Sequence, residues 1–361
     1  MRVIIAGGGT GGHVIPALAV AAELRRRSQQ RRSQEDEVLM VGTSRGLEAR
    51  LAPQNGLRLE TIAVGALKRV GAWQAGATLL RLPYSFWQAG RILDAFQPHV
   101  VYGVGGYASG PVLLMAAMKN IPVVVHEPNA APGFANRAIA PFVSRALVAF
   151  PEAQRFFPAG RVEVVGVPVR PEFFAAPRKA HRPPLTIFIS GGSQGSRKIN
   201  QAVIESLPLF ASSGEPFCFI HQTGEKDYEL VRAAFAQHGL EGRAEVIPFI
   251  EDMPGAFARA DLLVCRAGAA TLAEVTAAGK AAILVPFPFA ADDHQLKNAR
   301  SLEQAGAARF LLDAELNGRR LFDAVHEVLP RLEEMEENSR ALAQPRAAEK
   351  IVDVLERAAV H

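Results

Sequence analysis

The chain has 361 residues, of which 49% are hydrophobic and 7% aromatic, with 31 glycines and 24 prolines. This length and composition are typical of a folded, turn-rich protein of about two domains, and they exclude a fibrous or disordered chain. The formal net charge is +4, and the excess of basic residues lies in residues 1–168. Such a bias fits either an anionic partner for the first half or ordinary variation of the surface.

Neither a disulfide framework nor a membrane span is expected. Cys218 and Cys265 each lie in an apolar, strand-like run, which is typical of buried thiols in a reducing compartment. Glycines interrupt the apolar run after Arg2, so we expect no secretory signal. The longest uncharged stretch, residues 100–118, is broken by glycines and by Pro111 and should not cross a bilayer.

Apolar runs rich in β-branched residues alternate with helical segments along the chain. They cover residues 2–6, 37–41, 57–64, 99–104, 121–126 and 145–150, then 185–190, 216–222, 243–249, 261–265, 281–287 and 307–312. This alternation predicts an α/β fold of parallel sheets with helices on both faces. Prolines crowd residues 164–184, where we expect a linker. We therefore predict two Rossmann-like domains, 1–168 and 169–345, with a C-terminal helix at 346–361 that joins the first domain.

The first domain begins with a strand, a glycine-rich loop and a helix, in the stretch AGGGTGGHVIP. Gly7, Gly9 and Gly12 satisfy the dinucleotide fingerprint G-x-G-x-x-G. A nicotinamide site also needs an acid at the end of the second strand, but that strand ends in Gly42 and Thr43. The lysine spacing of a kinase-type P-loop is absent as well. The loop therefore indicates a diphosphate held by backbone amides and a helix N-terminus.

Two further glycine-rich loops follow predicted strands. SGGSQGS at 190–196 opens the second half and repeats the pattern of the first loop, and GVGGYASGP at 103–111 lies within the first half. Open α/β sheets bind their ligands at the carboxyl ends of parallel strands, where such loops lie. We therefore expect all three loops to face a cleft between the two domains.

Polar residues stand at the start of three helices that follow strands. His13 suits proton transfer near neutral pH, although an imidazole at this place can also simply pack on the loop. Glu274 suits either the hydroxyls of a ribose or a helix dipole. His294 and Gln295 suit sugar hydroxyls, while Asp292 or Asp293 fits the N-cap of the same helix.

Eight motifs in chain order carry a resemblance to a known family. They are GGGTGGHVIPALAVA, GVGGYASGP, HEPNAAPGFANR, GVPVR, GGSQGSRKIN, FIEDM, CRAGAATLAEV and DDHQLKNA. In this order they resemble the MurG-type N-acetylglucosaminyltransferases of bacterial peptidoglycan synthesis, over essentially the whole chain. The resemblance implies the two-domain GT-B fold. It also implies inverting transfer of N-acetylglucosamine from UDP-GlcNAc to the C4 hydroxyl of the muramyl sugar of undecaprenyl-pyrophosphoryl-MurNAc-pentapeptide, converting lipid I to lipid II.

His13 is the expected general base, because it is titratable, is expected to face the cleft and lies in the acceptor-side domain, with Glu127 as the alternative. The resemblance assigns roles to further residues. Gly105, Gly106 and Tyr107 are similar to the acceptor-pyrophosphate site. UDP-GlcNAc would be bound by Thr10, Gly11, Gly12, Asn129, Arg170, Ser193, Ile250, Ala269, Ala270, Thr271, Leu272, Ala273, Glu274, His294 and Gln295. No D-x-D pair occurs in a suitable loop, so we expect no metal and no other cofactor to be required.

A lipid-linked acceptor implies access to a membrane surface. Trp73, Leu79, Phe86 and Trp87 lie in one stretch with basic residues around them, which suits either a patch on an anionic membrane or the core of a helix. The resemblance implies a peripheral protein on the cytoplasmic face of the cell membrane, with cell-division and elongation proteins as candidate partners. Nucleic acid is not expected, because no aromatics interleave the arginine-rich run at 25–37.

Two other function classes fit a similar fold. One is a UDP-sugar epimerase, which would need additional acid and base groups. The other is a non-catalytic sensor that binds UDP-GlcNAc without turnover. Transfer of the sugar to a lipid acceptor separates the glycosyltransferase from both.

Overall fold

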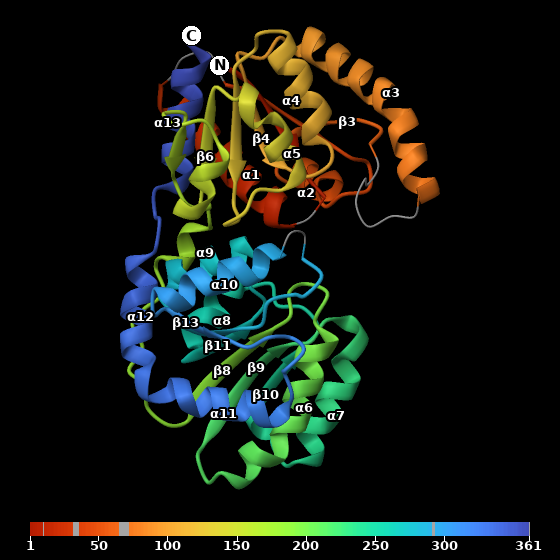
Figure 1. Cartoon of the computed structure of the whole chain (residues 1–361). Coiled ribbons are helices and arrows are strands. Elements are labelled where there is room, and N and C mark those ends of the chain that lie inside the picture. The colour runs from red at the N-terminus through yellow and green to blue at the C-terminus, as the bar shows by residue number, and fades with distance from the viewer. Residues whose placement is uncertain (10, 32–35, 65–71, 291–292, 361) are drawn as a thin grey trace. The chain divides into compact units, whose positions relative to one another are not determined.

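The computed structural model describes residues 1–9, 11–31, 36–64, 72–290 and 293–360, with only the backbone of 72–81 described. The chain forms two compact units, Met1–Val169 with Arg346–His361, and Arg170–Pro345 (Figure 1). We call them unit 1 and unit 2. Each is built on a parallel sheet, which confirms the predicted α/β fold class.

Unit 1 contains a parallel sheet with the strand order β3-β2-β1-β4-β5-β6-β7. Its strands are β1 Arg2–Gly7, β2 Glu37–Gly42, β3 Arg58–Thr61, β4 Val100–Gly105, β5 Val123–Glu127, β6 Arg145–Val148 and β7 Val162–Val164. Strand β7 was not predicted from the sequence. This strand has only three residues, lies at the sheet edge, and is not fully buried at any of them.

Helices cover both faces of the unit 1 sheet. They are α1 Gly11–Arg31, α2 Glu48–Gln54, α3 Ala72–Phe96, α4 Ser109–Met118, α5 Phe134–Ile139 and α13 Ala347–Ala359. The C-terminal helix α13 packs beside α1, where Arg27 contacts Asp353 at 2.6 Å. Ile351 and Leu355 of α13 are fully buried in the same apolar cluster as Val14 and Leu24 of α1. The last helix therefore completes the core of the first unit.

Unit 2 contains a second parallel sheet, with the strand order β10-β9-β8-β11-β12-β13. Its strands are β8 Leu185–Ser190, β9 Phe217–Gln222, β10 Ala244–Ile247, β11 Leu262–Cys265, β12 Ala281–Leu284 and β13 Ala308–Phe310. Its helices are α6 Arg197–Ser212, α7 Tyr228–Gln237, α8 Met253–Arg259, α9 Ala269–Ala278, α10 His294–Gln304, α11 Gly318–Val328 and α12 Leu332–Ala341. Cys265 is buried, Cys218 is half-buried, and both are free thiols.

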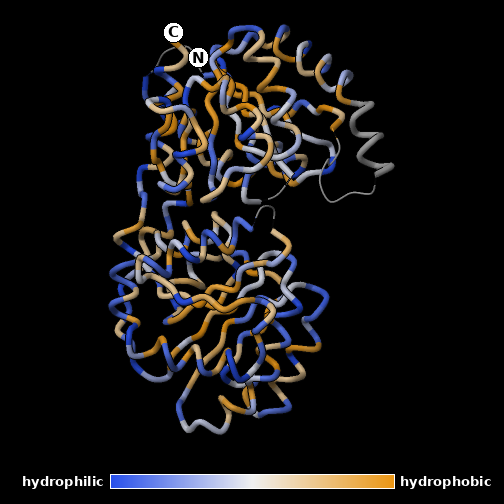
Figure 2. Tube along the Cα trace, viewed as in Figure 1, coloured by the Kyte–Doolittle hydropathy of each residue, from blue (hydrophilic) through white to orange (hydrophobic). Residues whose placement is uncertain are grey.

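The apolar strands form the centre of each unit, as the hydropathy colouring of Figure 2 shows. In unit 1, Val3 and Ile5 of β1 belong to the cluster on one face of the sheet, whereas Ile4 belongs to the cluster on the other. This follows from the alternation of side chains along a strand. Each fully buried Val or Ile stabilises the fold by roughly 1.5–3 kcal/mol before the entropy cost. The continuous apolar runs of the sequence are thus explained by burial on two faces.

Each sheet has a point where the strand order reverses. It lies between β1 and β4 in unit 1, and between β8 and β11 in unit 2. The loops that leave neighbouring strands in opposite directions create a crevice at such a switch point, and ligands of α/β sheets bind there. All three predicted glycine-rich loops follow one of these four strands.

Candidate functional site

The glycine loops after β1 and β4 meet at the switch point of unit 1. The Gly8 N–H donates to the Gly105 carbonyl at 3.3 Å. Gly8 and Gly106 have φ of 153° and 86°, and a Cβ on Gly106 would overlap the Gly8 carbonyl oxygen. Only glycines permit this approach of two backbones. Because α1 begins directly after the first loop, its N-terminal amides lie at this switch point.

His13 lies against the second of these loops. Its Nε2 atom is 3.0 Å from the position that a Cβ on Gly105 would take. The neighbouring His126 is fully buried and its Nε2 lies 2.9 Å from the Gly166 carbonyl. Burial, together with the charge of His13, lowers the pKa of His126 to about 4. His126 is therefore neutral near pH 7, whereas His13 is half-buried on α1.

Glu127 ends β5 and organises the loop that follows it. Its carboxylate accepts the backbone N–H groups of Asn129 at 3.0 Å and Gly133 at 3.1 Å, and the side-chain amides of Asn129 at 3.0 Å and Asn136 at 2.9 Å. Burial raises the pKa of Glu127 despite these donors. Both oxygens are engaged, which supports a role in shaping the loop around Asn129. A role for Glu127 as the base stays a prediction.

The remaining unit 1 candidates are placed as follows. Gly11 and Gly12 are the first residues of α1, and Tyr107 is 52% exposed beside Gly106. Thr10 lies outside the described residues. Glu48 was not among the predicted site residues, and its buried carboxylate accepts the Gly9 N–H at 2.7 Å.

In unit 2, Arg266 links the loops at the carboxyl end of the sheet. Its guanidinium donates to the Ser196 hydroxyl at 2.6 Å and to Asp313 at 2.5 Å. The Ser196 hydroxyl in turn caps α6 by accepting the Ile199 N–H at 3.4 Å. Arg266 therefore ties the glycine loop after β8 to the loops after β11 and β13. Sequence reasoning missed this residue.

Glu274 lies on α9, the helix that begins beside the unit 2 switch point. Its side chain is half-buried, and burial raises the pKa of Glu274 to about 7, while the charge of Arg170 acts in the opposite direction. The first amides of α9 have no partner within the helix and no side-chain cap. The predicted residues Ala269, Ala270, Thr271, Leu272 and Ala273 form this first part of α9.

The other unit 2 candidates gather around the same loops. Exposed Ser193 lies in the loop after β8. The Ile250 N–H donates to Gln222 Oε1 at 2.9 Å, and Gln222 Nε2 donates to the Gly192 carbonyl at 2.9 Å, so Ile250 is linked to that loop. One buried amide thus links Ile250 to Gly192, the residue before Ser193.

His294 and Gln295 are the first two residues of α10. The Gln295 Oε1 accepts the Phe287 N–H at 3.0 Å, which joins α10 to the loop after β12. Asp293 stands at the N-cap position without a capping side-chain bond. Asp293 thus has the predicted N-cap position but makes no side-chain cap, and Asp292 lies outside the described residues.

The aromatic stretch expected to contact a membrane lies on α3. Trp87 is 53% exposed and stacks on Tyr84 with ring centroids 5.6 Å apart, and the Arg91 guanidinium lies 4.9 Å from the Trp87 ring. Phe86 is half-buried. The side chains of Trp73 and Leu79 lie outside the described residues. Among the helices described, none is both long and apolar enough to cross a membrane.

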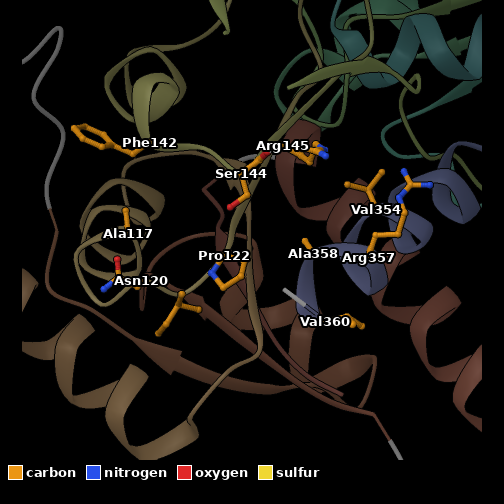
Figure 3. Close-up of a pocket in the computed structure, with 11 residues that line it drawn as sticks. Ala117, Asn120, Pro122, Phe142, Ser144, Arg145, Val354, Arg357, Ala358 and Val360 are labelled. Carbon is orange, nitrogen blue, oxygen red and sulfur yellow. Dashed lines mark hydrogen bonds between the residues drawn. The ribbon is translucent and has the colours of Figure 1, made fainter. Parts of the chain in front are cut away.

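A cavity of about 680 Å³ lies at the other end of the unit 1 sheet, before β5 and β6 (Figure 3). Its described lining residues are Ala117, Asn120, Ile121, Pro122, Phe142, Ser144, Arg145, Val354, Arg357, Ala358 and Val360. These include no predicted site residue. The candidate site is therefore carried by the loops at the switch points and not by this cavity.

Comparisons with known proteins agree along the whole chain. The model of the glycosyltransferase family 28 N-terminal domain matches residues 3–148, and that of the C-terminal domain matches residues 186–355. A protein of Solibacter usitatus (strain Ellin6076) is 54% identical over 99% of this chain and 96% of its own length. It is named UDP-N-acetylglucosamine--N-acetylmuramyl-(pentapeptide) pyrophosphoryl-undecaprenol N-acetylglucosamine transferase.

A second relative and one crystal structure are similar to this chain over nearly its whole length. A protein of the same name from Myxococcus xanthus (strain DK1622) is 44% identical over 98% of this chain and 92% of its own length. The crystal structure of Acinetobacter baumannii MurG is 33% identical, covers 99% of each chain and superposes with a TM-score of 0.82.

Proposed function

Because this chain belongs to glycosyltransferase family 28, we propose that it transfers N-acetylglucosamine from UDP-GlcNAc to undecaprenyl-pyrophosphoryl-MurNAc-pentapeptide. The sugar would be attached to the C4 hydroxyl of the muramyl residue with inversion, which converts lipid I to lipid II. The relative that is 54% identical carries the name of this activity. The observation that carries the proposal is the pair of switch points, each with glycine loops and a helix N-terminus suited to a diphosphate.

Unit 2 would hold the donor. The first amides of α9 and the loop around Ser193 suit the UDP diphosphate, because helix N-termini favour anions by about 0.3–2 kcal/mol. The Glu274 carboxylate would accept hydrogen bonds from the ribose hydroxyls, with Arg170 and Ile250 beside the uracil. His294 and Gln295, together with Asn129, Gly11, Gly12 and Thr10, would contact the donor sugar and its surroundings.

Unit 1 would hold the acceptor and the base. The acceptor pyrophosphate suits the loops with Gly105, Gly106 and Tyr107 and the N-terminus of α1. As the C4 oxygen bonds to the anomeric carbon of the donor, its proton passes to the His13 imidazole and the bond to the UDP oxygen breaks. Amides around Ser193 and at the start of α9 would stabilise the charge on the departing UDP.

No cofactor is proposed beyond the donor substrate, since amides and helix N-termini can meet the diphosphate charge. We expect EDTA to leave the transfer rate of the purified protein unchanged. Restoration by added Mg²⁺ after loss in EDTA would contradict this expectation.

The acceptor lipid implies a peripheral position on the cytoplasmic face of the cell membrane. The exposed Trp87 and Tyr84 on α3, with Arg91 beside them, fit an anionic lipid surface. Phe86, Trp73 and Leu79 belong to the same proposed patch. Cell-division and elongation proteins are the proposed protein partners, and nucleic acid is not a proposed partner.

One experiment separates the proposed function from its alternatives. The protein is incubated with radiolabelled UDP-GlcNAc, with and without lipid I, and label is followed in the lipid fraction together with free UDP. The transferase predicts labelled lipid and UDP release only with lipid I. An epimerase would convert the donor without acceptor, and a sensor would bind UDP-GlcNAc without either product.

A further inference from the structure

Glu48 carries a buried carboxylate that is bonded directly to the first glycine loop. It is the first residue of α2 and is 0% exposed. Oε2 accepts the Gly9 N–H at 2.7 Å, and Oε1 accepts both the N–H and the hydroxyl of Thr43 at 2.8 Å. The backbone adds a second link, since the Leu47 N–H donates to the Gly9 carbonyl at 3.3 Å.

Three glycines make room for this carboxylate. A Cβ on Gly8, Gly42 or Gly46 would overlap atoms of the Glu48 side chain. Burial disfavours the charged form, but the N–H donors of Gly9 and Thr43 outweigh it and lower the pKa of Glu48. The group is therefore an ionised, enclosed hydrogen-bond acceptor near neutral pH, and not a proton carrier.

The acid after the second strand has a different use here from the one it has in dinucleotide-binding sheets. There, the carboxylate at the end of the second strand accepts hydrogen bonds from a ribose. Here the turn at residues 42–47 directs the carboxylate back onto the protein, and both oxygens are occupied by protein donors. Glu48 is thus not available to a ligand.

The loop that Glu48 holds leads directly to the proposed base. Gly9 precedes α1, on which His13 stands, and the adjacent Gly8 N–H bonds to the Gly105 carbonyl at 3.3 Å. His13 lies against this loop, because a Cβ on Gly105 would be 3.0 Å from its Nε2 atom. A shift of Gly9 would therefore displace the N-terminus of α1, together with the glycine loops after β1 and β4.

We propose that Glu48 is a positioning residue for the transfer reaction, which fixes the loop of residues 7–9 and, through it, the orientation of His13 toward the acceptor hydroxyl. The inference rests on the proposed function for its kinetic part. It concerns unit 1 only, so binding of UDP to unit 2 should not depend on it.

The test compares Glu48→Gln with a matched control, Glu23→Gln. Glu23 is also a buried carboxylate of unit 1, but it lies within α1 after His13 and pairs with Arg26 and Arg27. The amide in Glu48→Gln keeps the size of the side chain but turns one acceptor into a donor, which faces an N–H group. We expect kcat to fall roughly tenfold or more, the KM for lipid I to rise, and the Kd for UDP to stay unchanged. Glu23→Gln should retain wild-type kcat and KM.

A second measurement does not require turnover. The pH titration of the His13 imidazole, followed by NMR, should shift in Glu48→Gln and stay at its wild-type position in Glu23→Gln. If Glu48→Gln does not fold, Glu48→Asp is used in its place, because it keeps the charge but cannot reach both donors.

The outcomes distinguish failure of the positioning role of Glu48 from failure of the proposed function. An unchanged His13 titration in the Glu48 variant overturns the positioning role, whether or not the wild type is active. Equal kcat and KM in the wild type and the folded Glu48 variant also overturn it. Failure of the wild type to label lipid, with a shifted His13 titration, overturns the proposed function and leaves the positioning of His13 supported.

Discussion

The Arg266 guanidinium donates to the Ser196 hydroxyl at 2.6 Å, across 70 positions of the sequence. This bond joins the loop after β11 to the residue that caps α6, and the same guanidinium contacts Asp313 after β13 at 2.5 Å. Arg266 therefore links the loops that are proposed to hold the UDP diphosphate, and its guanidinium contacts protein groups on two sides.

Replacing Arg266 with lysine should loosen these loops. A lysine ammonium is a single point charge and cannot bridge Ser196 and Asp313 as the planar guanidinium does. We expect the affinity for UDP, measured by calorimetry, to fall roughly tenfold with the fold retained. The control is Arg259→Lys, which alters an exposed pair with Glu245 and should leave affinity unchanged. Equal affinities of the two variants for UDP would argue against this role of Arg266.

Replacing His13 with alanine should remove most turnover. Loss of a general base typically costs 10²- to 10⁴-fold in rate, whereas the UDP site in unit 2 lacks this side chain. We therefore expect a large fall in kcat with the Kd for UDP unchanged. If His13→Ala keeps its rate while Glu127→Gln loses it, the base assignment is reversed.

Gly105→Ala tests the contact between the glycine loop and His13. Gly105 has a φ of 91°, and a Cβ there would lie 3.0 Å from His13 Nε2. The matched control is Gly160→Ala, where φ is 79° and a Cβ would meet nothing within 4 Å. Both variants should lose about 1–2 kcal/mol of stability from the backbone strain, as measured by urea unfolding. Only Gly105→Ala should lower kcat and displace the pH–rate profile, and equal profiles would contradict the contact.

The affinity for UDP should rise with pH through about 7 if Glu274 binds the ribose. Burial raises the pKa of Glu274 to about 7, so below that pH the carboxyl is neutral and a weaker acceptor. Charge-assisted hydrogen bonds contribute about 1.5–3 kcal/mol, so the change in Kd should reach roughly tenfold. Glu274→Gln should bind UDP weakly and lose the part of the pH dependence that comes from this carboxyl. It should retain the part that comes from titration of the UDP phosphate. A wild-type pH profile that matches Glu274→Gln would remove Glu274 from the ribose site.

The same raised pKa has a consequence for the stability of the free protein. The folded state keeps its proton to higher pH than the unfolded state, so the free energy of unfolding should decrease as pH rises from about 4.5 to about 7. Glu274→Gln should therefore have a higher Tm than the wild type at pH 8. A lower Tm would indicate that the carboxylate makes a stabilising contact.

Replacing Phe86 and Trp87 with serine should weaken binding to anionic vesicles at low salt. Trp87 is half exposed on α3 beside Arg91, and loss of the aromatic area reduces insertion at the interface. Leu230→Ser serves as the control, since Leu230 is 59% exposed on α7 of unit 2. Vesicle cosedimentation that is equal for a folded double variant and the wild type would exclude the patch.

The sequence predicted the fold well because burial on two faces leaves a strong apolar signal in each strand. The glycine loops were also predictable, since residues such as Gly106 are required by a close approach of two backbones. The missed strand β7 has three residues and little burial, so it carries almost no such signal.

The residues that support the site were harder to predict. Glu48 was missed because an acid was sought at the end of β2, whereas a turn brings in one from α2. Arg266 was missed because its partners Ser196 and Asp313 are 70 and 47 residues away. Contacts of this kind depend on the strand order, and the strand order follows from the packing of the whole unit.

The return of α13 to unit 1 affects the order in which the chain can fold during synthesis. Translation proceeds from the N-terminus, so every residue of unit 2 leaves the ribosome before Ala347–Ala359 does. Until then the apolar face of α1 that includes Val14 and Leu24 lacks the side chains of Ile351 and Leu355. Unit 1, although its first strands are made first, therefore completes its core only after the whole of unit 2 has been synthesised.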